Sequence, residues 1–335
     1  MPQTLRLSVL DQSVARSGVG HDQSIRDTVA LAEHCEALGY ERFWLSEHHA
    51  LPTIVGTAPE VLMAAIAART SRIRIGSAGV MLPHYAPLKV AEQFRVLDAL
   101  APGRIDLGVG RAPGGDQRTA RLLNPDPRAS EMFPQQVMEL HAWVNGVDLP
   151  PGHPGHGVHA LPRAATAPQL WMLGSSGYGA QLAAHLGMPY AFAHFIAEDA
   201  CEEALAQYRH AFRAGWTAQP EAAICVWALA ADTEEEAWRL FASRERTRLD
   251  RNLGRFGPLL PPEEAERPRT AQEEGYCAEL RAKALVGSAA QVADKLRALA
   301  AGMQVDQVAV ITWTWDARAQ RRSYELLARE FGLGA

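Results

Sequence analysis

Short apolar runs alternate with segments of helical periodicity along the whole chain. The apolar run at residues 5–10 precedes a helical pattern over 25–38 that ends before Gly39, and this succession continues to a last helical pattern at 318–331. A strand that follows a crossover helix pairs in parallel with the strand before it, so this order predicts a parallel sheet. The predicted strands lie at 5–10, 42–45, 72–76, 104–109, 170–173, 189–193, 222–230 and 307–311.

The number of predicted strands indicates the fold class. Eight strands, each followed by a helix, are the count of a closed (β/α)8 TIM barrel with insertions, in the α/β class. A chain of 335 residues with 47% hydrophobic and 21% charged residues can bury the core of one such barrel, so we predict a single domain over residues 1–335. An open doubly wound sheet is the alternative. The Pro, Gly and charged residues of two stretches predict insertions at about 145–167 and 252–280, the second of them mobile.

Charge and cysteine usage exclude several classes of protein. The formal net charge of -5 offers no basic surface for nucleic acid or an anionic membrane. The four cysteines are far apart and form no C-x-x-C pair, which argues against a disulfide framework and a zinc site. No window approaches the roughly 18 apolar residues of a membrane span, and the first residues lack a signal-peptide pattern. We therefore expect a cytoplasmic protein with reduced thiols.

Three histidines lie close together in the first insertion, at His153, His156 and His159. Imidazoles are common metal ligands. No carboxylate or cysteine at ligand spacing accompanies them, and the Gly- and Pro-containing backbone between them does not preorganise a site. We therefore predict a solvent-exposed loop and no metal site.

Ionisable residues follow the second predicted strand directly. The apolar residues 43–45 end in "SEHH" at 46–49. In α/β barrels the active site forms at the C-terminal ends of the strands, where the loops converge. Histidine suits proton transfer near neutral pH, because its ordinary pKa is about 6.5. Adjacent residues leaving a strand point to opposite sides, so we predict that only one imidazole faces the cavity and that Glu47 orients the other or caps the turn. An ordinary polar loop is the alternative.

Small residues and one arginine follow three further predicted strands. These strand ends read "SAG" at 77–79, "GVGRAPGGD" at 108–116 and "GSSG" at 174–177. Glycine and serine let a ligand approach the backbone closely, and Arg111 offers a planar fork of N–H donors that matches a phosphate. A helix that begins near Ser176 adds backbone N–H groups that face an anion. The glycine spacing of the second stretch is not the G-x-G-x-x-G of dinucleotide-binding folds. A salt bridge at Arg111 and a tight turn at 174–177 are the alternatives.

Four stretches together resemble the bacterial luciferase-like flavin monooxygenases. They are "WLSEHH", "RIRIGSAGVMLPHYAPLKVAEQ", "PGRIDLGVGRAPG" and "LWMLGSSG", and the resemblance runs over essentially the whole chain in the same order. The "LSVLDQS" start and the "GRAPGGDQ" run are most similar to single-chain luciferase-like oxidoreductases of the alkanal monooxygenase type. The resemblance implies a (β/α)8 barrel that binds FMN at its C-terminal mouth.

The resemblance also implies roles for residues at the strand ends. His48, the first histidine of the E-H-H motif, is implied to be catalytic. Ala78 and Gly79 match the place where the family packs against the isoalloxazine ring, often through a non-prolyl cis peptide bond. Arg111 matches the arginine that binds the phosphate. The other FMN-binding positions that the resemblance implies are Glu92, Gly174, Ser175, Ser176 and His194.

A reaction and partners follow from the same resemblance. Reduced FMN, supplied by a separate flavin reductase, reacts with O2 to give a flavin hydroperoxide that oxidises a small apolar organic substrate. We therefore expect an FMN-dependent monooxygenase that forms a homodimer through surface helices. No metal, nucleic acid or membrane is expected among its partners.

Two departures from the light-emitting members bear on the substrate. Those enzymes carry a reactive cysteine directly before the phosphate-binding arginine, where this chain has Gly110, and an acid in the phosphate loop, where this chain has "GSSG". Light emission and a long-chain aldehyde substrate are therefore not expected. A deazaflavin-dependent hydride-transfer oxidoreductase of the same superfamily is one alternative, and a non-catalytic flavin-binding protein is another. Residues 254–275 match the place where the family has a disordered lid.

Overall fold

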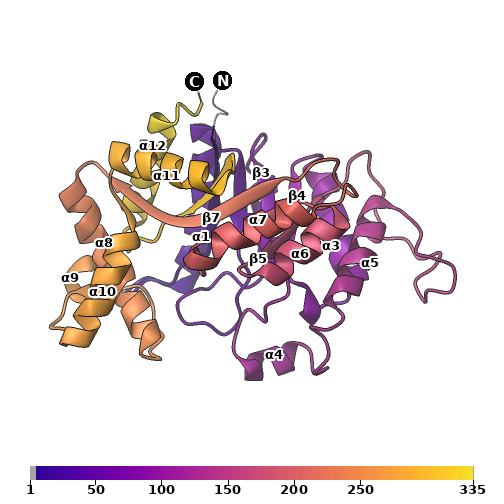
Figure 1. The fold of residues 1–335 in the computed structure, drawn as a ribbon, viewed down its shortest axis with the longest axis horizontal. Helices are drawn as coiled ribbons and strands as arrows, with labels where there is room; N and C mark the ends of the chain where they lie inside the picture. Colours follow the sequence, from indigo (N-terminus) through magenta and orange to yellow (C-terminus); the bar gives the residue numbers. More distant parts are fainter. Residues whose placement is uncertain (1–4, 335) are drawn as a thin grey trace. The chain divides into compact units, whose positions relative to one another are not determined.

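The structure, a computed structural model, describes residues 5–334 and divides into two compact units. The described part of unit 1 comprises residues 5–41, 51–56 and 225–334, and unit 2 comprises 42–50 and 57–224. Strands and helices alternate along the chain in both units (Figure 1). The prediction of a single domain stays a prediction.

Unit 2 contains parallel strands that are neighbours in the order in which the chain makes them. Their order is β6-β5-β4-β3-β2, and each pairs in parallel with the strand before it. Such pairing requires a crossover segment after each strand. The strands are β2 (Arg42–Leu45), β3 (Arg74–Met81), β4 (Ile105–Gly110), β5 (Gln169–Gly174) and β6 (Tyr190–Phe192). The helices are α2 (Pro59–Ala67), α3 (Pro87–Leu100), α4 (Gln117–Leu123), α5 (Phe133–Asn145), α6 (Gly177–Leu186) and α7 (Cys201–Ala211), with the 3-10 helices η1 (Leu82–His84) and η2 (Glu198–Ala200).

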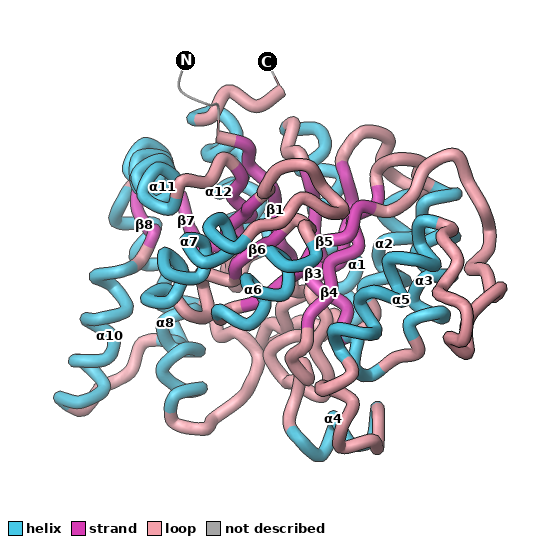
Figure 2. Tube along the Cα trace, turned by 45° about the vertical axis from the view of Figure 1, so that its right-hand side comes forward, coloured by secondary structure: helices cyan, strands magenta, loops and turns pink. Residues whose placement is uncertain are grey.

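Helices α2, α3 and α5 lie side by side along β3 and β4 (Figure 2). On α3 the buried residues Val90, Phe94 and Leu97 repeat at helical spacing, so one face of the helix turns to the sheet. Full burial of each such side chain stabilises the fold by about 1.5–3 kcal/mol. This packing fixes the helices that flank the ends of β2 and β3.

A buried ionic network joins the starts of three strands in unit 2. Asp106 on β4 is fully buried and accepts hydrogen bonds from the Arg42 guanidinium (2.8 Å) and the Trp44 indole N–H (2.9 Å). Arg74, the first residue of β3, donates to the same carboxylate. Removing one partner of such a buried group costs about 3–5 kcal/mol, because charge is left uncompensated. The network fixes the register of β2, β3 and β4 relative to one another. It therefore also fixes the positions of their C-terminal ends.

Unit 1 contains β1 (Arg6–Asp11), most of β7 (Ala222–Ala231), β8 (Leu285–Ser288) and β9 (Gln307–Ile311). β1 pairs in parallel with β9, and the last residues of β7 pair in parallel with β8. The first three residues of β7 pair with β6 in unit 2, and the chain enters unit 1 at Cys225. The helices of unit 1 are α1 (His21–Leu38), α8 (Glu234–Asn252), α9 (Pro262–Ala265), α10 (Ala271–Lys283), α11 (Ala289–Met303) and α12 (Ala317–Glu330).

Each of the predicted strands is present, and the third is longer than predicted because it continues to Met81. The structure adds β8, which was not predicted because its apolar run is only Leu285 and Val286 before a glycine and a serine. It also adds α4 in the connection after β4. The stretch 252–280, which was expected to be a mobile insertion without a core element, contains α9 and most of α10.

The charged residues around α10 form ion pairs and a helix cap. Its charge-rich composition therefore did not indicate a mobile segment. Thr270 and Glu273 form a capping box at its start. Glu245 on α8 is 3% exposed, and its carboxylate lies 2.6 Å from Arg269 and 2.7 Å from Arg281. A charge-rich sequence that would suit a solvated loop therefore forms a helix joined to α8 by buried ion pairs.

Within residues 5–334 no helix combines the length and apolar character that a membrane crossing needs. In the same part of the chain, no three His, Cys, Asp or Glu side chains gather as a set of metal ligands. His153 lies 3.0 Å from Glu139 instead. All four cysteines are buried, and none forms a disulfide.

Candidate active site

The loop after β2 carries a buried carboxylate with three donors. Glu47 is 1% exposed and accepts hydrogen bonds from the Met81 N–H (3.0 Å), the Tyr85 hydroxyl (2.5 Å) and His49 Nε2 (2.7 Å). Burial, followed by the hydrogen bond to Glu47, raises the pKa of the Tyr85 hydroxyl above its ordinary value, so Tyr85 stays a donor. Glu47 therefore ties the loop after β2 to the end of β3 and to the residue after η1.

The two adjacent imidazoles have different partners. His49 is held by Glu47, and its backbone N–H donates to the Gly114 carbonyl in the loop after β4 (3.0 Å). His48 is half-buried, and its Nδ1 shares a hydrogen bond with Ser46 Oγ (3.2 Å). Glu47 thus orients one imidazole, as predicted, and that imidazole is His49. The catalytic role of His48 stays a prediction.

Two glycines let β3 and β4 approach each other closely beside this loop. The Ala78–Gly79 peptide bond is cis, as predicted. A Cβ at Gly79 would lie 2.8 Å from the Gly108 carbonyl oxygen, and a Cβ at Gly108 would collide with the Ser77 carbonyl. Ser77 Oγ donates to the Gly108 carbonyl at 2.9 Å. Side chains at the two glycines would push the strands apart, so β3 and β4 approach this closely only with glycine at both positions.

The loop after β4 folds back over the loop after β2. Gly114 has a positive φ of 63°, which glycine adopts without strain. A Cβ at Gly115 would lie 2.7 Å from the His49 carbonyl oxygen. By contrast, a Cβ at Gly110 would meet no atom within 4 Å. The position that carries a cysteine in the light-emitting enzymes therefore faces open space, and nothing in the packing requires a glycine there.

Arg111 lies at the N-terminal end of α6. Its guanidinium carbon is 3.7 Å from the centroid of the ring of Tyr178, the second residue of that helix. Ser176 is the N-cap residue, but its side chain accepts no hydrogen bond from the helix. Within residues 5–334 the Arg111 side chain makes no hydrogen bond or ion pair, so the salt-bridge alternative is not found there. The arginine and the first N–H groups of α6 can therefore face an anion together.

Of the remaining predicted FMN-binding residues, some lie in or beside the loop at 174–176 and one lies on a helix surface. The Ala193 N–H donates to the Gly174 carbonyl (2.8 Å), so the backbone before His194 lies beside the loop of Gly174, Ser175 and Ser176. Glu92 on α3 is 41% exposed, and its carboxylate lies 3.9 Å from Lys89. The structure thus brings His194 toward the 174–176 loop and leaves Glu92 on the helix surface. The roles of all these residues stay predictions.

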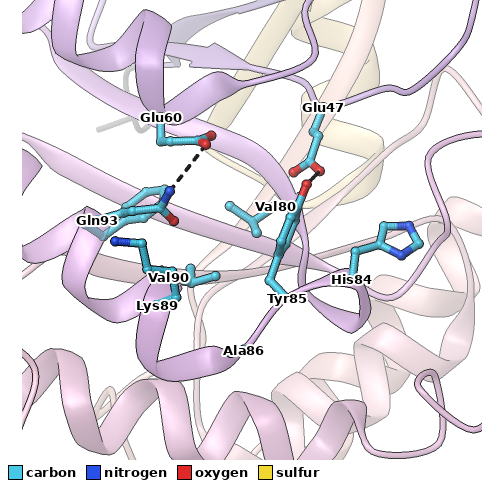
Figure 3. A pocket seen from close by; sticks show the side chains of 10 residues that line it. Glu47, Glu60, Val80, His84, Tyr85, Ala86, Lys89, Val90 and Gln93 are labelled. Atoms are coloured by element: carbon cyan, nitrogen blue, oxygen red, sulfur yellow. Dashed lines mark hydrogen bonds between the residues drawn. The ribbon is translucent and has the colours of Figure 1, made fainter. Parts of the chain in front are cut away.

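A cavity of about 250 Å³ lies between α2, α3 and the loop after β2 (Figure 3). Figure 3 shows the Tyr85 hydroxyl pointing toward Glu47 and the Gln93 amide toward Glu60. Burial raises the pKa of Glu60, and the nearby Glu47 charge adds to this. The sequence analysis missed Tyr85 and Glu60 as site residues, although Tyr85 stands in the "LPHYAP" run that follows the third strand.

A family model described as luciferase-like monooxygenase matches residues 5–307. The chain belongs to this family. N-acetyl-S-alkylcysteine monooxygenase of Bacillus subtilis is 37% identical over 328 residues, which is 97% of each chain. A luciferase-like monooxygenase of Escherichia coli K12 is 36% identical over 327 residues, 97% of this chain and 96% of its own. The predicted family is confirmed.

Several solved structures are similar to this chain. Apo-MsnO8 matches with a TM-score of 0.89 at 36% identity, over 98% of this chain and 99% of its own. The oxygenating constituent of 3,6-diketocamphane monooxygenase of Pseudomonas putida, in complex with FMN, matches with a TM-score of 0.72 at 18% identity, over 98% and 97%. An F420-dependent secondary alcohol dehydrogenase matches with a TM-score of 0.66 at 14% identity, over 97% and 98%. The fold is the predicted closed, eight-stranded parallel (β/α)8 TIM barrel, to which β8 is additional.

Proposed function

We propose that this luciferase-like monooxygenase uses reduced FMN and O2 to oxidise a small apolar organic substrate. The observation that carries the proposal is Arg111, an exposed arginine without an ionic partner in residues 5–334, beside the uncapped start of α6. A guanidinium that no carboxylate neutralises suits a phosphate monoester such as that of FMN. The FMN complex of a protein with the same fold supports the choice of cofactor.

The residues at the strand ends fit FMN. Arg111 and the loop of Gly174, Ser175 and Ser176 would hold the phosphate. The cis peptide of Ala78 and Gly79, at the end of β3, would lie against the isoalloxazine ring, because these two residues carry no large side chain of their own. His194 and Glu92 complete the proposed set of FMN-binding residues.

The chain's own residues would bind the reactants and move protons. Bound reduced FMN supplies two electrons, with which one atom of O2 enters the substrate and the other leaves as water. His48 is the proposed acid–base group, and Ser46 orients its ring through Nδ1. Glu47 keeps His49 out of this role by accepting its Nε2–H. Groups of this kind contribute typically about 10²–10⁴-fold to a rate.

The substrate, the source of reduced flavin and the cellular location are also part of the proposed function. The Bacillus subtilis relative is named for N-acetyl-S-alkylcysteine, so thioethers with a small S-alkyl group are the first substrates to try. A separate flavin reductase is proposed to supply reduced FMN. We place the protein in the cytoplasm, where buried cysteines without disulfides such as these would stay reduced.

A homodimer is the proposed assembly. Val61 on α2 and Val96 and Leu100 on α3 are exposed apolar side chains, which supports contact through these helices. Static light scattering should give a mass near twice the 36.5 kDa of one chain. A mass near that of one chain would contradict this assembly.

Deazaflavin-dependent hydride transfer is the second candidate, because the F420-dependent dehydrogenase has a similar fold. Tight binding of F420 together with no binding of FMN would replace the proposed function with this one. A non-catalytic flavin-binding protein would instead reoxidise reduced FMN without consuming any organic substrate.

Arg111→Ala tests the proposal. Loss of a charged donor should weaken FMN binding by about 1.5–3 kcal/mol, which is roughly one to two decades in Kd. Riboflavin lacks the phosphate and is the matched control, so its Kd should change little. Isothermal titration with both flavins measures the two values. Equal losses for FMN and riboflavin would show that Arg111 does not bind the phosphate.

A further inference from the structure

The Arg111 guanidinium lies against the face of the Tyr178 ring, with 3.7 Å between the guanidinium carbon and the ring centroid. Tyr178 is the second residue of α6, and its side chain is 36% exposed. The stack therefore joins the loop after β4 to the first turn of α6. It holds Arg111 beside the helix N–H groups that lack intrahelical acceptors.

An aromatic ring differs from the usual ionic partner of an arginine. A carboxylate would neutralise the guanidinium charge and occupy two of its N–H donors. A ring face attracts the cation through its quadrupole, and the guanidinium donors lie in the cation's own plane. The stack thus restrains Arg111 while its charge and its N–H groups stay available to an anion.

An Arg111 side chain that is ordered before the ligand binds should lower the entropic cost of binding. An arginine side chain has many rotamers, and it loses this freedom when a ligand orders it. Part of that cost is removed from the binding step when a neighbour already orders the side chain. A stacked Arg111 should therefore bind a phosphate more tightly than the same arginine left mobile on the surface.

We propose that Tyr178 is a positioning residue that holds Arg111 for the phosphate of the flavin. This rests on the proposed function, because it takes Arg111 as the phosphate-binding side chain. Tyr178 acts through Arg111, and its effect falls on the selectivity for FMN over riboflavin. Any aromatic side chain at this position meets the requirement, since the hydroxyl is not part of the stack.

The experiment compares Tyr178→Leu and Tyr178→Phe in two backgrounds, the natural chain and Arg111→Ala. Leucine retains an apolar side chain without a ring face, and phenylalanine retains the ring. Flavin fluorescence titrations give the Kd of FMN and of riboflavin for each variant. In the natural background, Tyr178→Leu should weaken FMN binding about two- to fivefold, and Tyr178→Phe should not. Riboflavin binding should not change in either variant.

The Arg111→Ala background separates positioning from general packing. Without a guanidinium to position, Tyr178→Leu should have no further effect on FMN binding. An equal loss in both backgrounds, or an equal loss for riboflavin, would overturn the role given to Tyr178. So would unchanged FMN binding in Tyr178→Leu. If the natural chain does not prefer FMN over riboflavin, the proposed function itself fails and this inference fails with it.

Discussion

Adjacent residues in the loop after β2 have different hydrogen-bond partners. The alternation of side chains along an extended segment predicted that the two imidazoles differ, and Glu47 was expected to orient one of them or to cap the turn. The donors to Glu47 could not be predicted, because Tyr85 and the Met81 N–H come from a distant part of the chain. The stack of Arg111 on Tyr178 was missed for the same reason. Contacts between strand ends depend on the fold, whereas the kinds of residue at those ends can be seen in the sequence.

The histidines give the prediction at this scale. In His48→Ala, FMN affinity should stay almost unchanged, while reoxidation of bound reduced flavin in the presence of substrate should slow by about 10²–10⁴-fold. His49→Ala should cost much less in rate. It should instead lower the free energy of unfolding by about 1–3 kcal/mol, because the buried Glu47 carboxylate loses a donor.

Stopped-flow absorbance of the flavin after mixing reduced enzyme with O2 measures the rates, and urea unfolding measures the stabilities. The two variants are matched controls for each other, since each removes one imidazole from the same loop. Unchanged kinetics in His48→Ala, or a larger kinetic defect in His49→Ala, would remove His48 from the mechanism.

At the scale of helices and strands, the hydrophobic pattern predicted the structure better than the composition did. The apolar runs predicted every strand of the barrel, because buried parallel strands are nearly continuous in Val, Ile, Leu and Ala. Composition misled for α10, where charged residues form ion pairs with a buried partner instead of facing water. Residues 253–257 do form the irregular, exposed segment that composition predicts. Gly254 has a positive φ there, and Phe256 is 53% exposed.

The contrast between the exposed segment 253–257 and the ion-paired helix α10 predicts where a protease cuts. Trypsin should cut first after Arg255, in the exposed segment, and later after Arg269 and Arg281, which pair with Glu245. Glu245→Ala should lower the free energy of unfolding by about 3–5 kcal/mol and expose the last two sites to early cleavage. Peptide mass spectrometry over a digestion time course shows the order of cuts.

Glu263→Ala is the control, because it removes an exposed ion pair, that with Arg239, from the same part of unit 1. Its effect on stability should stay within about 1 kcal/mol. Early cleavage after Arg269 in the natural chain, or equal destabilisation by the two substitutions, would show that the buried pairs do not hold α10.

For the whole molecule, the count of β/α repeats predicted the fold class, and a few short motifs predicted the family. The identity of the cofactor does not follow from either, since proteins of the same fold hold FMN or F420. The proposed role of Arg111 favours a ligand with a terminal phosphate. The substrate stays open, because the loops that shape a pocket vary on a constant barrel.

Heat stability of the whole chain should therefore report which flavin it binds. A ligand at 100 times its Kd adds about 2.7 kcal/mol to the free energy of unfolding. The entropy of unfolding for 335 residues is about 0.7 kcal/mol per kelvin, so saturating FMN should raise Tm by about 4 °C. Riboflavin at the same concentration lacks the phosphate contact and should raise it by about 0.5–2 °C. Differential scanning fluorimetry with FMN, riboflavin and F420 gives the three shifts. In Arg111→Ala the FMN shift should fall to that of riboflavin, whereas an F420 shift that exceeds the FMN shift in the natural chain would favour hydride transfer over oxygenation.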